Sequence, residues 1–268
     1  MRVLVALNTE QAESRSLVGM PADSSTQQVF VVAKKAPVAS YTHTLGLLGL
    51  FAGYFMVAFI LNSSTQEPGA SVQPTARPNL LPGYFESIAF DWAILWYVWR
   101  GLRDRGIGLL QLSGGRWASP RHVLSSLLLA VPFWILWEAV AITVSRLLAT
   151  TGSAGSDRWV VPEGAIEVSI WIALSLTAGF CEELIFRGYL QHQFSAFFRN
   201  NIIGIFCQGI IFGLVHPRGW QAVLTISVLG WLYGVWATWR RDLKSNIFAH
   251  AMSDIWEGWL KHLLALPF

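Results

Sequence analysis

The segment Ile170–Gly188, IWIALSLTAGFCEELIFRG, joins an apolar stretch to two adjacent glutamates and an arginine. Its apolar part, Ile170–Cys181, is long enough to form most of a membrane helix. Glu182 and Glu183 follow at once, with Arg187 one helical turn later. An ionised carboxylate at membrane depth costs several kcal/mol unless it is paired, so an acid there marks a candidate functional site. The segment therefore predicts a membrane helix that ends in a functional site.

The composition of the whole chain is that of a polytopic membrane protein. Of its 268 residues, 53% are hydrophobic and 13% are charged, and the mean hydropathy is +0.45, whereas soluble domains carry about 25% charged residues. The net charge of +3 does not indicate a nucleic-acid partner, because the basic residues cluster in short loops beside apolar segments. Cys181 and Cys207 lie in apolar runs without metal-type spacing, which predicts free, buried thiols.

Seven apolar segments predict an all-α, polytopic transmembrane helix bundle, because a bilayer core of about 30 Å needs about 20 mostly apolar residues per helix. We expect residues 1–41 to form a mostly irregular cytoplasmic extension and residues 42–268 to form the bundle. A Pro-rich linker, Asn62–Pro82, separates the first two segments, and the second and fifth segments are short for lipid contact. The segments are Thr42–Leu61, Tyr84–Trp99, Val123–Leu148, Ala165–Leu190, Ile202–His216, Ala222–Trp239 and Ser245–Leu264.

Basic residues in short loops favour the cytoplasmic side of a membrane. Here they precede the first segment and follow the second, fourth and sixth, so they alternate consistently between the two sides. This pattern predicts a multi-pass protein of a bacterial plasma membrane, surrounded by the lipid bilayer, with its amino terminus in the cytoplasm. The residues are Lys34, Lys35, Arg100, Arg103, Arg105, Arg116, Arg121, Arg199, Arg240, Arg241 and Lys244.

The segment that follows the apolar stretch contains the pattern EExxxR. Glu183 and Arg187 are four residues apart and share a helix face, where a Glu before an Arg can pair favourably. Glu182 is rotated from its neighbour by about 100° and faces another partner. One acid can then be held by the arginine while the other is free to act. The alternative is an ordinary surface ion pair at a cytoplasmic helix end.

Two later segments each supply a histidine. Phe212–His216 reads FxxxH, and a neutral imidazole there can exchange a proton, ligate a metal ion or simply hydrogen-bond at a helix end. His250–Asp254 reads HxxxD, and its two ends lie one helical turn apart. Asp254 can fix the tautomer of the imidazole or accept a hydrogen bond from a bound molecule. The three patterns come from three separate segments and can converge in the interior of a bundle.

The order EExxxR, FxxxH, HxxxD resembles the CAAX prenyl protease type II and bacteriocin-processing family, called the CPBP intramembrane proteases. The sequences FRGYLQ and FGLVH, the glycines Gly230 and Gly234, and the Arg-Arg turn that follows them are similar to this family as well. The resemblance covers Glu182–Asp254 and implies a protease core at about residues 165–264. Asp254 stands where the family often has Asn, which adds a possible charge.

For this chain the resemblance implies an intramembrane endopeptidase, which hydrolyses a peptide bond in a peptide or a membrane-associated protein. Glu182 and His216 would position and deprotonate a water molecule. His250 and Asp254 would hold the oxyanion or orient the scissile carbonyl. The supporting residues would be Glu183, Arg187 and Phe212.

The sequence leaves metal dependence open. Two histidines and a carboxylate can make an open zinc site, and in a metal-dependent variant Glu182, His216 and His250 would be the ligands. The strong zinc signature HExxH is absent, and a metal-free glutamate mechanism uses the same residues.

Two other classes of protein remain as alternatives. One is a proton-coupled transporter, because chains of acids and histidines also relay protons in membranes. The other is a membrane interaction protein without catalysis. The chain shows no internal repeat of the polar pattern, which transporters often display, and every family residue is present. The sequence therefore favours the protease hypothesis.

The protease hypothesis requires the side chains of Glu182, His216 and His250 to meet. At about 1.5 Å of rise per residue, straight full-length helices would place His216 deep or towards the outer side, and His250 near the cytoplasmic boundary. Either the fifth helix begins late and Pro217 starts a loop that folds back into the bundle, or the helix boundaries differ from those predicted.

Overall fold

A computed structural model of the protein describes residues 36–64, 77–117, 119–148, 162–216 and 219–260. Within these ranges the chain forms helices and no strands. The predicted fold class, an all-α helical bundle, is confirmed. Most of the expected amino-terminal extension, residues 1–35, lies outside the described residues, and the first described helix begins at Tyr41.

Each predicted apolar segment overlaps a helix, although the helix ends differ. The seventh continues as a π-helical turn to Leu260, and its predicted end, residues 261–264, lies outside the described residues. The second helix is 23 residues long and therefore long enough to cross a bilayer core. The fifth remains short, at 14 residues. The longer helices are α3 (Tyr41–Ser64), α4 (Leu81–Arg103), α6 (Pro120–Leu148), α7 (Gly164–Glu182), α9 (Asn201–Leu214), α10 (Trp220–Arg240) and α11 (Lys244–Ile255), and the short ones are α5 (Leu109–Leu112) and the π-helical η3 (Trp256–Leu260).

The fourth segment continues beyond its predicted end at Leu190. Helix α7 runs directly into a π-helical turn, η2 (Glu183–Leu190), and α8 (Gln191–Phe198) follows without a break. Gln191 and Gln193 are buried. The first donates a hydrogen bond to α10, and the second donates one to the residues that precede α3. The polar residues of α8 thus have partners inside the bundle, and the helix does not need to end where the apolar sequence ends.

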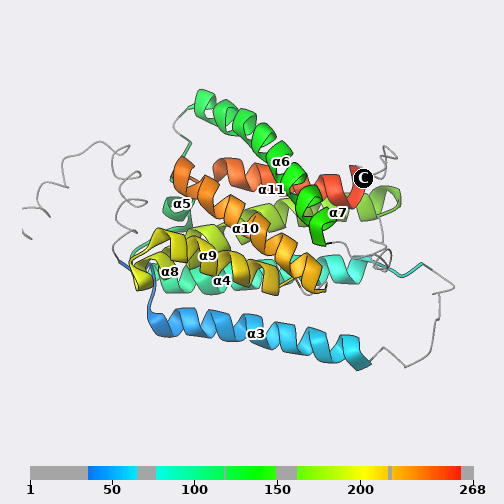
Figure 1. Cartoon of the computed structure of the whole chain (residues 1–268), viewed down its shortest axis with the longest axis horizontal. Coiled ribbons are helices and arrows are strands. Elements are labelled where there is room, and N and C mark those ends of the chain that lie inside the picture. The colour runs from blue at the N-terminus through cyan, green and yellow to red at the C-terminus, as the bar shows by residue number, and fades with distance from the viewer. Residues whose placement is uncertain (1–35, 65–76, 118, 149–161, 217–218, 261–268) are drawn as a thin grey trace, which may run out of the picture.

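Helix α3 lies along one edge of the bundle and α6 along the opposite edge, with the other long helices between them (Figure 1). Helix α10 packs against α9 and α6, α11 packs against α7 and α6, and α4 packs against α7. All residues of η2 are buried, and its apolar side chains join those of α3, α4 and α9 in the main hydrophobic core. The two adjacent acids therefore enter the interior of the bundle.

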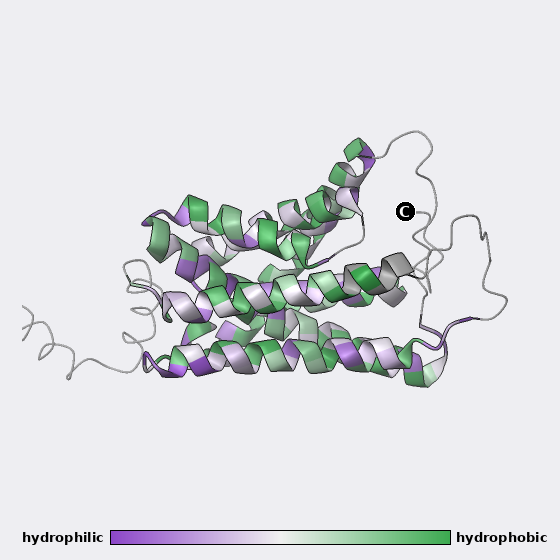
Figure 2. Ribbon diagram, turned by 90° about the horizontal axis from the view of Figure 1, so that it is seen from below, coloured by the Kyte–Doolittle hydropathy of each residue, from purple (hydrophilic) through white to green (hydrophobic). Residues whose placement is uncertain are grey.

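Among the described residues, three helical stretches are long and apolar enough to cross a membrane: Pro120–Leu148, Gly164–Phe198 and Trp220–Arg240. Apolar side chains also cover much of the outer surface, since Leu128 on α6 is 63% exposed and Trp96 on α4 is 61% exposed. Figure 2 shows hydrophobic residues distributed along the whole length of the helices. Such a surface suits lipid better than water, which indicates a membrane protein.

Two of the loops that carry basic residues meet at one end of the bundle. The backbone N–H of Leu243, between α10 and α11, donates to the carbonyl of Ser113, between α4 and α6, at 3.1 Å. Lys244 donates from Nζ to the carbonyl of Gly114 at 3.2 Å. These loops were predicted to share one side of the membrane. That this side is the cytoplasm stays a prediction.

Glycines let α9 and α10 approach closely. A Cβ placed on Gly230 of α10 would lie 2.8 Å from the Cα of Gly209 on α9, so the two backbones are in direct contact. Small residues at such crossings are typical of helix pairs in membranes, where close packing replaces the hydrophobic effect as the source of association.

We predict that Gly230→Leu lowers the stability of the detergent-solubilised protein, because the larger side chain forces the helices apart; overpacking of this kind costs about 1–3 kcal/mol. The measurement is the midpoint of thermal unfolding by circular dichroism. Gly53→Leu on α3 is the matched control, since an added Cβ there meets nothing within 4 Å. Equal midpoints for the two variants would contradict the close packing.

Candidate active site

An ion pair within η2 lies at the centre of the site. Arg187 donates from Nη1 to Oε1 of Glu183 at 2.8 Å, and both side chains are 0% exposed. The predicted pairing of these two residues is therefore observed. The alternative of an ordinary surface ion pair is wrong, because a surface pair would be open to solvent. π-helical turns are rare and occur mostly at functional sites.

Aromatic rings and a backbone carbonyl surround the buried guanidinium. The Arg187 Cζ atom lies 4.2 Å from the centroid of the Phe212 ring and 4.8 Å from that of Tyr233. Its Nη2 lies 3.5 Å from the carbonyl oxygen of Gly230. A cation over desolvated aromatic faces is attracted by the ring quadrupoles. Phe212, which the sequence assigns a supporting role, is thus in direct contact with the buried ion pair.

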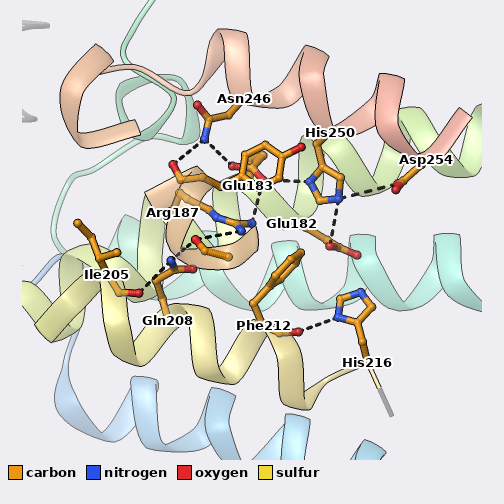
Figure 3. A network of polar contacts seen from close by, with 12 residues as sticks. Glu182, Glu183, Arg187, Ile205, Gln208, Phe212, His216, Asn246, His250 and Asp254 are labelled. Atoms are coloured by element: carbon orange, nitrogen blue, oxygen red, sulfur yellow. Dashed lines mark hydrogen bonds and ion pairs between the residues drawn. The ribbon is translucent and has the colours of Figure 1, made fainter. Parts of the chain in front are cut away.

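The Glu183 carboxylate accepts hydrogen bonds from three side chains. Besides Arg187, His250 donates from Nδ1 to Oε1 at 3.0 Å, and Asn246 donates from Nδ2 to Oε2 at 3.1 Å (Figure 3). A buried carboxylate needs such partners, because a charge without them is costly at low dielectric. Since a carboxylate only accepts, His250 carries its proton on Nδ1. Fixing the tautomer of His250 was one of the two roles predicted for Asp254. In the structure Glu183 has this role.

The other nitrogen of His250 faces the second glutamate. The Nε2 atom lies 3.7 Å from Oε2 of Glu182 and 3.9 Å from Oδ2 of Asp254. Both separations are longer than a hydrogen bond. Among the described residues the Glu182 Oε2 atom, although buried, has no hydrogen-bond partner. Polar groups separated by more than 3.5 Å can be joined by a bridging water.

His216 reaches the same region from the end of α9. It lies two residues beyond Leu214, and its Nδ1 donates to the carbonyl of Phe212 at 2.7 Å. The centroid of the Phe212 ring lies 4.9 Å from that of His216 and 6.0 Å from that of His250. Figure 3 shows Glu182 between the two imidazoles. The two imidazoles thus both lie near the Phe212 ring.

The sequence predicted that His216 and His250 would lie at different depths in the membrane. This prediction assumed that α11 starts at the membrane boundary. Helix α9 does not begin late, since it starts at Asn201, and Pro217, where a loop was predicted to start, lies outside the described residues. Instead, Lys244, Ser245 and Asn246 at the start of α11 are buried, at 4%, 0% and 0% exposed. The loop around α5 covers this end of the helix through the hydrogen bonds described above. The start of α11 is therefore inside the protein and does not mark the membrane boundary from which the depth of His250 was counted.

The side chains as placed do not fit a metal ion. Within the described ranges, no group of three His, Cys, Asp or Glu side chains is arranged to hold one. We therefore derive no step through a metal, and the zinc ligand set stays a prediction.

Two residues near the site were missed by the sequence interpretation. Asn246 lies one turn before His250 on α11 and supports Glu183, and its spacing gives the pattern NxxxHxxxD. Asp91 lies on α4 and is close enough to Glu182, His250 and Asp254 to act on their charges. The signal for Asp91 is an acid in the middle of an apolar segment, which could have been read in the same way as Glu182.

The fold and the site together define a helical membrane protein with a buried glutamate–histidine centre. Residues 164–256 match the family described as "Type II CAAX prenyl endopeptidase Rce1-like". The resemblance to CPBP proteases is confirmed over this segment, which contains every residue that was assigned to the site. This supports protease activity of the CAAX type in general terms.

A curated relative is similar over a longer stretch. The chain is 27% identical over 135 residues to "Uncharacterized protein YpbD" of Bacillus subtilis (strain 168), which is 45% of this chain. The chain spans 65% of the length of that relative. No solved structure matches the chain.

We predict that Glu183→Ala destabilises the fold by about 3–5 kcal/mol, because it leaves the Arg187 guanidinium buried without its carboxylate. The double variant Glu183→Leu/Arg187→Leu should cost clearly less, since it removes both charges. The measurement is chemical denaturation in detergent. Arg77→Ala, which removes an ion pair at the exposed end of the bundle, is the control and should shift the midpoint least. A double variant less stable than Glu183→Ala would contradict this account of the pair.

Proposed function

We propose that the protein is an intramembrane endopeptidase that hydrolyses a peptide bond with water activated by Glu182. The observation that carries the proposal is the Glu182 Oε2 atom, which is buried, accepts no hydrogen bond from the described part of the chain and lies 3.7 Å from the Nε2 atom of His250. A buried polar atom without a partner calls for an explanation, and a catalytic role is one such explanation. The family match over residues 164–256 supports a peptide bond as that target.

The tautomers of both histidines suit the activation of water. His216 donates from Nδ1 to a carbonyl, so its Nε2 is an acceptor. His250 donates from Nδ1 to Glu183, so its Nε2 is also an acceptor and faces Glu182. A water held by Glu182 and His216 can then lose a proton to the carboxylate as it attacks the scissile carbonyl carbon. His216 orients the water, and Glu182 is the base.

The remaining groups act on the intermediate. Attack converts the carbonyl into a tetrahedral oxyanion, which needs hydrogen-bond donors in a water-poor site. Before the attack, His250 takes up a proton from solvent at Nε2, and this N–H then donates to the oxyanion while Glu183 stabilises the imidazolium through Nδ1. Asp254 lies 3.9 Å from the same Nε2 and helps to hold the charged ring. Glu182 then returns its proton to the leaving amine as the C–N bond breaks.

The substrate is a peptide or a membrane-protein tail, because the bundle carries the site between helices with apolar outer surfaces. We place the protein in a bacterial plasma membrane with its amino terminus in the cytoplasm, in line with the alternation of basic loops. Zinc remains a candidate cofactor only in a metal-dependent variant of the same site. A proton-coupled transporter and a non-catalytic interaction protein remain the alternatives. Neither would hydrolyse peptides, so a cleavage assay distinguishes them from a protease.

We predict that Glu182→Gln lowers the cleavage rate of membrane peptides by the purified, detergent-solubilised protein by about 10²- to 10⁴-fold, the usual contribution of a general base. His216→Ala and His250→Ala should show losses of the same order. Cleavage is measured by mass spectrometry on a library of peptides with apolar segments, and folding of each variant is checked by circular dichroism.

Glu86→Gln and His122→Ala are the controls, since they remove an acid and an imidazole outside the site. The metal-free mechanism predicts that a chelator leaves the wild-type rate unchanged. Retained cleavage in folded Glu182→Gln would overturn the proposal. Proton flux into vesicles without any peptide cleavage would favour the transporter instead.

A further inference from the structure

Helix α3 is bound to the bundle through its amino-terminal half. Thr44, Leu47 and Phe51 are 1%, 0% and 6% exposed, whereas Met56 and Val57 are 58% and 56% exposed. Leu47 and Phe51 belong to the main hydrophobic core together with residues of η2. The segment that matches the protease family, residues 164–256, begins beyond α3. This half of α3 nevertheless contacts the turn that carries the ion pair of the site.

One of these contacts is a hydrogen bond between side chains of α3 and η2. His43 Nδ1 lies 2.8 Å from the Tyr189 hydroxyl, and His43 Nε2 lies 2.9 Å from the backbone carbonyl of Tyr97 on α4. Since a carbonyl only accepts, Nε2 carries the proton, and Nδ1 of the neutral ring accepts from Tyr189. The imidazole is stacked on the Tyr97 ring at 4.1 Å and lies against Gly101, where a Cβ would overlap it. His43 is therefore held in one orientation between α4 and η2.

Tyr189 belongs to a longer chain of hydrogen bonds. Its hydroxyl lies 3.0 Å from Thr44 Oγ1, which accepts from the Gln193 amide at 2.5 Å. Gln193 also donates to the carbonyl of Ala39 and accepts from the backbone N–H of the same residue. Since Tyr189 has one proton and gives it to His43, Thr44 is the donor in its contact with Tyr189. A buried network in which each donor has an acceptor specifies a single arrangement.

A second line of contact from α3 runs through aromatic rings. Phe51 is stacked on Phe186 of η2 with 5.6 Å between the ring centroids, and Phe186 meets the ring of Phe212 edge-on at 4.9 Å. Phe212 in turn covers the guanidinium of Arg187. Helix α3 thus contacts η2 both before and after Arg187 in the sequence, at Phe186 and at Tyr189.

The winding of η2 connects these contacts to Glu182. A π-helical turn closes i→i+5 hydrogen bonds and is rare compared with the α-helix, so contacts with other helices are needed to keep it. At the start of η2, Glu183 is held by Arg187 and by two side chains of α11. Near its end, Tyr189 is held by α3. If Tyr189 were released, the turn could return to α-helical winding, which would rotate Glu182 relative to the rest of the helix.

We propose that His43 is a positioning residue of the reaction: it holds Tyr189, so that η2 keeps the winding that turns Glu182 towards the site. This inference rests on the proposed function and adds to the site a residue from outside the segment that matches the family. His43 acts through Tyr189 and η2 and does not touch the reacting atoms.

The test compares two substitutions of His43 in the full-length protein in lipid nanodiscs. An asparagine places its side-chain oxygen near the position of Nδ1, so His43→Asn keeps an acceptor for Tyr189. A glutamine places its amide near the position of Nε2, so His43→Gln keeps the bond to the Tyr97 carbonyl and loses the one from Tyr189. Both substitutions remove the ring and one hydrogen bond, which makes each the control for the other.

We expect His43→Gln to lower kcat about 10- to 100-fold with KM unchanged, because a small displacement of a catalytic group has an effect of this size. His43→Asn should retain most of the wild-type kcat. The rates are measured on the peptide of the library that the wild-type protein cleaves fastest. Equal kcat values for the two variants, or losses that follow the thermal midpoints of the variants, would show a merely structural role and overturn the proposal.

Tyr189→Phe removes the same hydrogen bond from its other side and should show the same loss of kcat. In the double variant His43→Gln/Tyr189→Phe the two losses should not add, since both remove one contact. Additive losses would contradict the proposal. Tyr54→Phe removes a hydroxyl from a part of α3 where the side chain is 37% exposed, and this matched control should keep the wild-type kcat.

Amide deuterium exchange of residues 183–190 separates this inference from the reaction. Exchange there should be faster in His43→Gln than in His43→Asn and in the wild type, whether or not a peptide is cleaved. This result in a protein that cleaves no peptide would remove the proposed function and keep the hold of α3 on η2. Equal exchange in all three proteins would overturn the inference, while cleavage by the wild type would leave the proposed function standing.

Discussion

The buried ion pair between Glu183 and Arg187 is the interaction on which the site depends. Arg187 contacts the Phe212 ring on α9 and the backbone of α10, and Glu183 receives hydrogen bonds from two side chains of α11. One pair of charges on η2 thus connects three other helices. Successive helical residues point in different directions, so fixing Glu183 inside this network turns Glu182 towards a different partner. The division of labour between two adjacent acids follows from this geometry.

Burying these charged groups costs free energy, which indicates that they serve the site and not the stability of the fold. Charged groups and their hydrogen bonds are expensive to bury, and a buried ion pair by itself adds little stability. A protein that only had to fold could fill the same space with apolar side chains. The π-helical turn, the buried carboxylate oxygen of Glu182 and the acids beside it all break local rules at one place, as functional sites commonly do. Around them, the apolar core and the glycine contact of α9 with α10 supply ordinary packing.

Much of the fold follows from the sequence, because an apolar run of sufficient length has few alternatives to a membrane helix. The EExxxR spacing likewise predicts the Glu183–Arg187 pair, since residues four apart meet on one face. The continuation into α8 could not be predicted, because Gln191 and Gln193 look like loop residues until their partners on α10 and before α3 are known. The depth of His250 depends on the loop around α5, which no pattern within α11 reveals. Asn246 was missed because its role arises only from its contact with Glu183 on another segment, whereas Asp91 was missed although an acid within an apolar segment is a readable signal.

The central claim is that Glu182 and His250 face one another across the gap between α7 and α11. In a variant without Cys181 and Cys207, the pair Glu182→Cys/His250→Cys can be tested in native membranes with the shortest bifunctional thiol reagent, followed by mass spectrometry of the linked peptides. The account predicts rapid linkage of this pair and none for Glu182→Cys/Glu86→Cys, whose second residue lies on the exposed face of α4. Two thiols at positions 182 and 250 that each react with a monofunctional reagent but never become linked would contradict it.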